Sequence, residues 1–123
     1  MRTVMIILQI AASAGLLNVW LLRFNQRTAY RGGTAGSMRE EFAAYGLPVW
    51  FAYVIGTLKV GAALALIAGI WFPATVLPAA ALVCVLMLGA LAMHLKISDP
   101  FTKSVPAIVM LTLCLGICWG ATR

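Results

Sequence analysis

The chain has 123 residues, of which 63% are hydrophobic, and a net charge of +6. Soluble domains are about 45–50% apolar, and a soluble chain of this length has too little interior to bury so much apolar surface. The composition therefore excludes a soluble domain. Four apolar runs, each long enough to cross a hydrocarbon core of about 30 Å, predict an all-α integral membrane protein. We expect a four-transmembrane-helix bundle that forms a single domain over residues 1–123.

The first predicted helix covers Thr3 to Leu22. Its beginning resembles a secretory signal peptide, because a short apolar run leads to the small residues "ASA" at positions 12–14. The apolar run continues past this site as "GLLNVWLL", which favours a retained helix over a cleaved leader. Polar residues inside the helix are predicted to hydrogen-bond to neighbouring helices: Gln9, Ser13 and Asn18.

The connection after the first helix ends in "SMREEFAAYGLP". Ser37, followed three residues later by Glu40, forms a capping box. This motif predicts a short helix from Met38 to Tyr45, amphipathic enough to lie on the membrane surface, which Gly46 ends in the left-handed conformation. The preceding "YRGGTAGS" lacks the Gly-Lys-Ser/Thr ending of a phosphate-binding loop, which argues against a nucleotide site.

The second predicted helix runs from Pro48 to Phe72 and carries Lys59 about 16 Å along its axis. A lysine near the centre of a bilayer costs roughly 2.5–3.5 kcal/mol, so we expect Lys59 to face the bundle interior. Small residues on the same helical face allow another helix to approach: Ala52, Gly56 and Ala63. The alternative is a lysine that snorkels to the interface, but its stem reaches only part of that distance.

The third predicted helix, from about Val76 to Ile97, carries the only histidine of the chain, His94, within one turn of its end. A histidine in this position is often a group stabilised by the helix dipole or bonded to the backbone. The alternative is a functional role for the imidazole, which titrates near physiological pH.

The fourth predicted helix runs from about Pro100 to Ala121. Asp99 precedes Pro100, and this pair predicts an N-cap followed by the first helical residue. Pro106 is expected to kink the helix and to free the carbonyl of Thr102.

Basic residues in the connections predict the orientation of the chain. Four spans place both termini on one face, together with the connection between the second and third helices. That face carries Arg2 and Arg123, whereas the other face carries six basic residues: Arg23, Arg27, Arg31, Arg39, Lys96 and Lys103. The positive-inside rule then predicts that both termini lie outside a bacterial-type inner membrane. These residues are interpreted as contacts with anionic lipids, because a nucleic-acid site would need a basic soluble face with base-stacking aromatics.

Tryptophan and cysteine residues are given structural interpretations. All four tryptophans lie near predicted helix ends, which is typical of an interfacial aromatic belt: Trp20, Trp50, Trp71 and Trp119. The cysteines lie inside predicted spans, without a Cys-x-x-Cys pair, and are interpreted as small hydrophobic residues: Cys84, Cys114 and Cys118. One histidine is too few for a metal site or for bis-histidine haem within a single chain.

We expect polar residues from several helices to form one pocket on the cytoplasmic side. Lys59 leans toward the N-terminus of its helix and so toward the level of His94, while Asp99 is placed at the rim. The two glutamates of the short helix approach this pocket only if that helix folds over its mouth. The candidate ligand-binding residues are Lys59, His94, Asp99, Gly56, Lys103 and Glu40. The competing interpretation keeps their roles separate: Asp99 caps a helix, His94 fills a helix end, and Lys59 pairs elsewhere.

The order of several segments resembles the DoxX-like family of small four-helix membrane proteins. The likeness covers nearly the whole chain, and its most specific pieces are Gly46-Leu47-Pro48, Gly56 to Lys59, and His94 with Asp99-Pro100. The family is named after a subunit of an archaeal thiosulfate:quinone oxidoreductase, and its eukaryotic relatives include a receptor-assembly chaperone. Many members carry an acidic residue where this chain has Lys59. The resemblance therefore implies a fold and a location but not a reaction.

Three function classes follow from these observations. The first is a binding or accessory subunit with an intramembrane pocket for a quinone-like or anionic lipid-like molecule. The second is a quinone-linked oxidoreductase subunit with His94 as the proton-handling group. The third is an assembly factor for other membrane proteins, and a homo-oligomer or a larger membrane complex is compatible with each class. The sequence favours the first, because no flavin, haem, metal or thiol-pair motif is present.

Overall fold

The structure, a computed structural model, describes residues 2–22 and 36–122. Within this part of the chain all regular elements are helical. The helices are α1 (Arg2–Leu17), α2 (Met38–Ala44), α3 (Val49–Ala68), α4 (Val76–Lys96) and α5 (Val105–Ala121). A π-helical turn, Asn18–Leu22, continues α1, and 3-10 turns precede α4 at Pro73–Thr75 and α5 at Phe101–Ser104.

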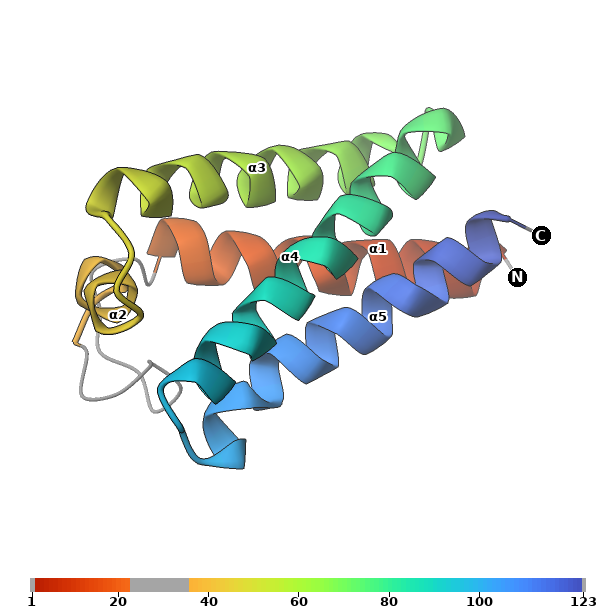
Figure 1. Ribbon diagram of the computed structural model, residues 1–123. Helices are drawn as coiled ribbons and strands as arrows, with labels where there is room; N and C mark the ends of the chain where they lie inside the picture. Colours follow the sequence, from red (N-terminus) through yellow and green to blue (C-terminus); the bar gives the residue numbers. More distant parts are fainter. Residues whose placement is uncertain (1, 23–35, 123) are drawn as a thin grey trace.

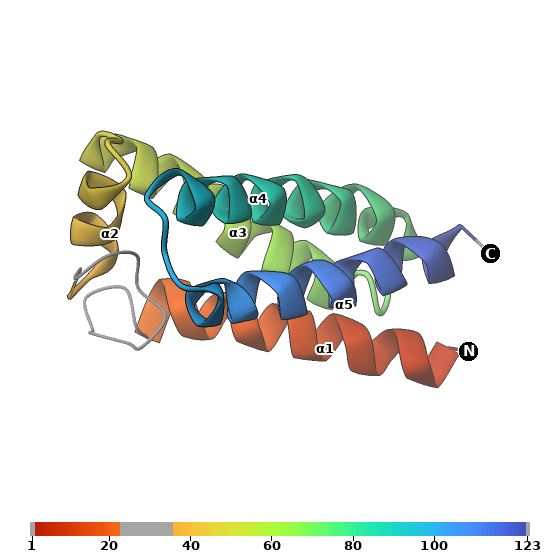
Figure 2. The same ribbon diagram turned by 60° about the horizontal axis from the view of Figure 1, so that its bottom comes forward.

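The four long helices form a bundle, and α2 lies across one of its ends (Figures 1 and 2). Both termini lie at the opposite end, next to the connection between α3 and α4 (Figure 1). The helices long and apolar enough to cross a membrane are Arg2–Leu22, Val49–Ala68, Pro73–Lys96 and Phe101–Ala121. The predicted all-α bundle with four spans is therefore confirmed, and the chain is an integral membrane protein.

Small and branched side chains fill the centre of the bundle. The core residues with no exposed surface are Ala12, Ala52, Ala63, Leu66, Ala80, Val83, Cys114 and Ile117. Large apolar residues face outward and are more than half exposed, among them Ile7, Leu64, Val85 and Leu115. In water such a surface would favour aggregation, whereas lipid chains solvate it. The exposed face therefore fits a hydrocarbon environment.

Two polar side chains of α1 join it to α3 inside the bundle. The Gln9 side-chain amide donates to the carbonyl of Leu66 at 2.8 Å, and the Ser13 hydroxyl donates to the carbonyl of Ala63 at 3.0 Å. Such bonds between membrane helices contribute about 0.6 kcal/mol each on average. The predicted role of these two residues in helix association is confirmed.

The ends of α2 follow the sequence prediction closely. The Ser37 hydroxyl accepts a hydrogen bond from the backbone N–H of Glu40, and the Glu40 carboxylate accepts one from the N–H of Gly36. Gly46 has a φ of +79°, a value in the left-handed region that glycine adopts at little cost. The helix does not lie apart from the bundle, because Met38, Glu41 and Phe42 are buried against it.

The beginning of α5 differs from the prediction. The chain first forms the 3-10 turn Phe101–Ser104, with Pro100 as its N-cap, and the α-helix starts only at Val105. Pro106 therefore lies in the first turn of α5, where a missing N–H costs nothing, and the predicted kink is wrong. The predicted N-cap role of Asp99 is also wrong, because the Asp99 side chain pairs with His94 instead.

Candidate functional site

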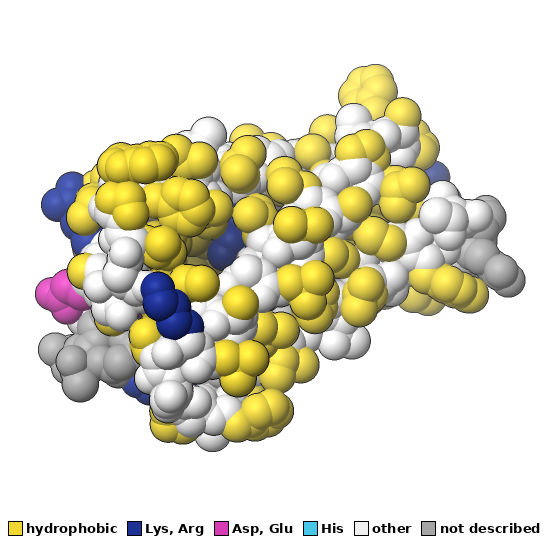
Figure 3. All heavy atoms as spheres, viewed as in Figure 1, with side chains coloured by type: hydrophobic (Ala, Val, Ile, Leu, Met, Phe, Trp, Pro, Cys, Tyr) yellow, Lys and Arg dark blue, Asp and Glu magenta, His cyan; other side chains and the backbone are white. Residues whose placement is uncertain are grey.

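A cavity of about 1070 Å³ opens where α2 lies across the end of the bundle. Figure 3 shows a hollow between α3 and α4 with a basic side chain inside it. All five helices contribute to the wall, and most of the lining side chains are apolar. The polar lining residues are Asn18, Glu41, Tyr45, Lys59, His94 and Lys103. Mostly apolar walls with a few placed polar groups, at a volume near the upper end of the usual 300–1,000 Å³, are typical of small-molecule sites.

Lys59 lies on the face of α3 that points into the bundle. Only 9% of the residue is exposed, so the expectation that it faces the interior is confirmed. Its ammonium lies 5.0 Å from the centroid of the Trp20 ring, within the range of a cation–π interaction. Lys59 therefore brings a positive charge to the wall of a mostly apolar cavity.

Trp20 departs from the predicted aromatic belt. Trp50, Trp71 and Trp119 are each more than half exposed, as the belt prediction requires, but Trp20 is only 6% exposed. The π-helical turn after α1 directs its ring inward, where it meets Phe42 edge-on with ring centroids 6.2 Å apart. π-Helical turns occur frequently at functional sites. The prediction that Trp20 belongs to the interfacial aromatic belt is therefore wrong, because its ring is part of the cavity wall.

Gly56 provides the space that Trp20 occupies. A Cβ atom at position 56 would lie 2.7 Å from Cε3 of the Trp20 ring, closer than real Cβ atoms approach. Gly56 does not line the large cavity but a separate open groove between α3 and the π-helical turn Asn18–Leu22. Its contribution to the candidate site is therefore indirect, through the position of the aromatic ring beside Lys59.

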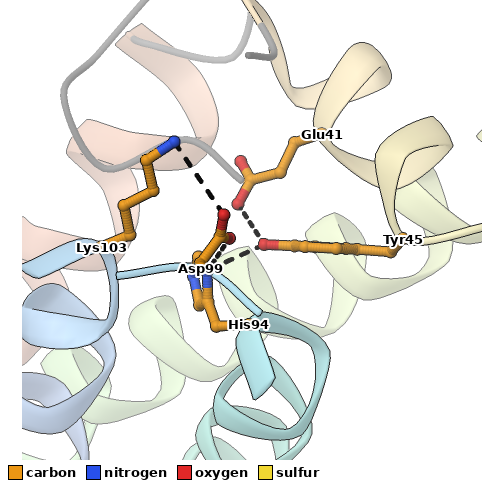
Figure 4. Close-up of polar contacts among 5 residues, drawn as sticks. All are labelled: Glu41, Tyr45, His94, Asp99 and Lys103. Atoms are coloured by element: carbon orange, nitrogen blue, oxygen red, sulfur yellow. Dashed lines mark hydrogen bonds and ion pairs between the residues drawn. The ribbon is translucent and has the colours of Figure 1, made fainter. Parts of the chain in front are cut away.

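A chain of polar contacts connects the end of α4 to α2 (Figure 4). His94 Nδ1 lies 2.8 Å from Asp99 Oδ2, and Nδ1 is the donor because a carboxylate only accepts. On the other side of the ring, Nε2 lies 3.5 Å from the hydroxyl oxygen of Tyr45. That hydroxyl donates to the Glu41 carboxylate at 2.6 Å. All four residues lie in the part of the molecule where α2 covers the bundle.

The backbone at the end of α4 explains why Asp99 reaches His94. Ser98 adopts a φ of +57°, and its N–H bonds to the carbonyl of Leu95 while the N–H of Asp99 bonds to the carbonyl of His94. This pair of bonds is a Schellman motif, in which an apolar contact commonly joins the positions of His94 and Asp99. Here a hydrogen bond between the imidazole and the carboxylate takes its place, with side chains that are 7% and 5% exposed.

Two lysines, Lys96 and Lys103, add positive charge at this end of the bundle. Lys103 Nζ lies 4.0 Å from Asp99 Oδ1, on the side away from His94 (Figure 4). Lys96 Nζ donates to the backbone carbonyl of Tyr45 at 2.9 Å, so it holds the end of α2 against α4. The contacts of Tyr45 with His94 and Lys96 thus join α2 to the end of α4.

The six ligand-binding residues predicted from the sequence fall into three groups according to where they lie. Lys59, His94 and Lys103 lie on the wall of one cavity. Asp99 and Gly56 support wall residues, the first through His94 and the second through Trp20. Glu40 is exposed and caps α2, outside the cavity. The residue that lines the cavity in its place is its neighbour Glu41, because α2 turns that side chain toward the bundle.

Sequence reasoning did not assign Tyr45 and Trp20 to the site. Tyr45 follows Glu41 by four residues, the spacing that places two side chains on one helical face, and this spacing is the signal that could have found the pair. No comparable signal marks Trp20, because the inward direction of its ring depends on the π-helical turn. Among residues 2–22 and 36–122, no group of three His, Cys, Asp or Glu side chains is arranged to hold a metal ion.

The hydroxyl of Tyr45 is expected to contribute measurably to stability. Tyr45→Phe removes the bond to Glu41 and the contact with His94, which leaves buried polar groups without this partner and costs about 1–3 kcal/mol. The matched control is Tyr53→Phe, because Tyr53 is 45% exposed and its hydroxyl accepts bonds from the exposed Arg39. Unfolding of the purified protein in detergent gives both values. A loss as large for Tyr53→Phe as for Tyr45→Phe would contradict this assignment.

The fold defines a small integral membrane protein with four helices long and apolar enough to cross a membrane. The chain belongs to the DoxX-like family, whose family pattern it matches over residues 7–117. It is also similar to the uncharacterized protein YdgD of Bacillus subtilis (strain 168), with 32% identity over 83 residues, which cover 67% of this chain and 73% of that protein. No solved structure matches the chain significantly.

Proposed function

We propose that this protein is a binding or accessory subunit that holds an amphipathic molecule, quinone-like or anionic lipid-like, inside the membrane. The observation that carries the proposal is the cavity of about 1070 Å³ with apolar walls and a basic residue, Lys59, in its wall. Because the volume is large and the polar groups are few, the cavity suits a molecule with a small polar head and a long apolar tail.

The distribution of lining residues supports one orientation of this molecule. Apolar side chains of α1, α4 and α5 offer a surface for the tail, among them Leu16, Met87, Ala107 and Met110. The head would lie near Lys59, Tyr45 and His94, which present an ammonium, a phenol and an imidazole to the cavity. These groups can bind carbonyl, carboxylate or phosphate oxygens, the polar atoms of the proposed ligand classes.

Filling the cavity should remove the bound molecule. Gly89 lines the cavity, and a Cβ atom added there meets nothing within 4 Å, so Gly89→Leu places its side chain in the cavity or at its edge without a backbone clash. The matched control is Gly61→Leu, which also has free space but lies outside this cavity. Solvent extraction and mass spectrometry should find a specific molecule in wild-type protein and in Gly61→Leu, and a reduced amount in Gly89→Leu. The same amount in all three, equal to that of bulk lipid, would refute the proposal.

An oxidoreductase is the second candidate, and one observation favours it. Asp99 holds the His94 imidazole by a 2.8 Å bond, an arrangement that orients a proton-handling group. Electrons would have to come from a partner protein or an added reductant. Reduction of a quinone by membranes that contain the wild-type chain and an electron donor, but not by membranes with His94→Gln, would favour this candidate over simple binding.

We further propose the orientation in which the end of the bundle with α2 faces the cytoplasm of a bacterial-type inner membrane. The described residues at that end include Arg39, Lys96 and Lys103, and basic residues concentrate on the cytoplasmic side. Four more basic positions of the prediction, Arg23, Arg27, Arg31 and Arg123, lie outside the described residues. In a variant without native cysteines, Thr122→Cys should react with an impermeant maleimide from outside intact cells, and Thr102→Cys should not. The opposite pattern would reverse the orientation.

A further inference from the structure

We infer that the head of the bound molecule is an anion, a carboxylate or a phosphate, and that Lys59 is its main binding residue. This inference rests on the proposed function, since it assumes that the cavity holds an amphipathic molecule. It goes further because it excludes a neutral quinone as the preferred ligand.

The first argument is that every acidic side chain of the protein has other partners. The chain contains three acidic residues, and all three lie in the part that the structure describes. Glu40 accepts the N–H of Gly36, Glu41 accepts the Tyr45 hydroxyl, and Asp99 pairs with His94 and Lys103. None of these carboxylates forms an ion pair with Lys59, for which a carboxylate oxygen would have to lie within 4.0 Å of Nζ. Glu41 attracts the ammonium electrostatically but forms no ion pair with it.

The second argument is the environment of the ammonium. Lys59 is more than nine-tenths buried, and its three N–H donors need acceptors. The ring face of Trp20 attracts the charge but accepts at most one weak hydrogen bond. No fully buried side-chain nitrogen of the described residues lacks a hydrogen-bond partner, so the ammonium, which has none, is accessible from the cavity that Lys59 lines. An anionic head in the cavity would supply both the missing charge and the missing acceptor oxygens.

The third argument is the sign of the charge around the cavity. Lys59 and Lys103 line it together with a single carboxylate, that of Glu41. A neutral carbonyl head would accept a hydrogen bond from Lys59 but would leave Glu41 as the acidic group that acts on its charge. An anionic head adds the attraction between opposite charges, which is stronger near a low-dielectric interior than in water, so the cavity should discriminate between an acid and its uncharged derivative.

The test uses two probes that differ only in charge. cis-Parinaric acid, a fluorescent fatty acid, and its methyl ester are titrated into the purified protein in nanodiscs, and energy transfer from tryptophan reports binding. Wild-type protein should bind the acid about tenfold more tightly than the ester. Lys59→Met, which keeps the length and apolar stem of the side chain, should lose this preference and still bind the ester. Lys59→Arg should retain most of the preference, because it keeps the charge.

Competition then distinguishes the two sources of an anionic head. Displacement of cis-parinaric acid by palmitate alone indicates a carboxylate, whereas stronger displacement by lysophosphatidic acid indicates a phosphate. Either result supports an anionic ligand when the zwitterionic lysophosphatidylcholine competes poorly.

Two results would overturn the inference in different ways. Equal affinity of wild-type protein for acid and ester, with displacement of both by decylubiquinone, would refute the anionic head and leave the proposed function intact. Failure of all probes, including the ester and decylubiquinone, to bind at this cavity would refute the proposed function itself. The comparison of acid with ester needs no variant, so it stands even if Lys59→Met fails to fold.

Discussion

Asp99→Ala is expected to lower the free energy of unfolding by about 1.5–3 kcal/mol, the largest loss for any single polar side chain of this site. Removal of the carboxylate leaves His94 Nδ1–H without its acceptor, and a hydrogen bond to a charged group contributes about 1.5–3 kcal/mol. Asp99 and His94 are 5% and 7% exposed, and their 2.8 Å bond is the centre of the contacts that join α4 to α2. Reversible unfolding in mixed micelles, followed by circular dichroism, measures the loss.

The control for Asp99→Ala is Glu40→Ala, since both variants remove one acidic side chain. Glu40 is exposed and supports only the first turn of α2, so its loss should cost about 1 kcal/mol or less. A double variant, Asp99→Ala with His94→Ala, should lose less than the sum of the single variants, because the two side chains interact directly. Additive effects, or equal losses for Asp99→Ala and Glu40→Ala, would show that the pair does not stabilise this end of the bundle.

Gly56→Ala is expected to destabilise the protein by about 1–3 kcal/mol, although alanine is the better helix former. The added Cβ atom would lie 2.7 Å from the Trp20 ring, so the ring must shift, and its contact with the ammonium of Lys59 is disturbed. Gly61→Ala, five residues further along the same helix, meets no atom within 4 Å and should stabilise the protein by up to about 1 kcal/mol. The two substitutions are chemically identical, so opposite signs isolate the contact with Trp20.

Fluorescence gives a second measurement of the same displacement. Replacement of the three exposed tryptophans, Trp50, Trp71 and Trp119, by phenylalanine leaves Trp20 as the only indole emitter. In this background Gly56→Ala should shift the Trp20 emission to longer wavelength, because the displaced ring becomes more accessible to water. Unchanged emission together with unchanged stability would mean that α1 and α3 separate easily and that the close approach at Gly56 is unimportant.

The sequence was sufficient to predict the bundle, because hydropathy and helix signals agree along most of the chain. Each apolar run became a helix whose ends lie within a few residues of the prediction, and the capping box before α2 formed as expected. The burial of Lys59 also followed, since the energetic cost of a lipid-facing lysine leaves few alternatives. These features depend on the local sequence pattern and on the lipid environment of the helices.

The details of the candidate site could not be predicted in the same way. The residue in the left-handed conformation after a helix is usually glycine, but after α4 it is Ser98. The sequence therefore contains no signal for the turn that brings Asp99 to His94. Pro106 was equally ambiguous, because its effect depends on whether the helix begins before or after it. The direction of Trp20 depends on a π-helical turn, and the role of Tyr45 depends on where α2 packs. Tertiary contacts decide each of these.

The contact between Tyr45 and His94 has a consequence for the synthesis of the protein. These residues are 49 positions apart in the chain, and α2 leaves the ribosome well before its partner on α4. At a synthesis rate of about 5–20 residues per second, Tyr45 is made several seconds before His94. Asp99 follows His94 immediately, so this local pair can form as soon as the end of α4 is made. Phe42 of α2 can pack against Trp20 and Phe51 before α4 is made, so the contact between Tyr45 and His94 forms after that packing. This contact therefore distinguishes a molecule in which α4 is in place from one that still lacks its final two helices.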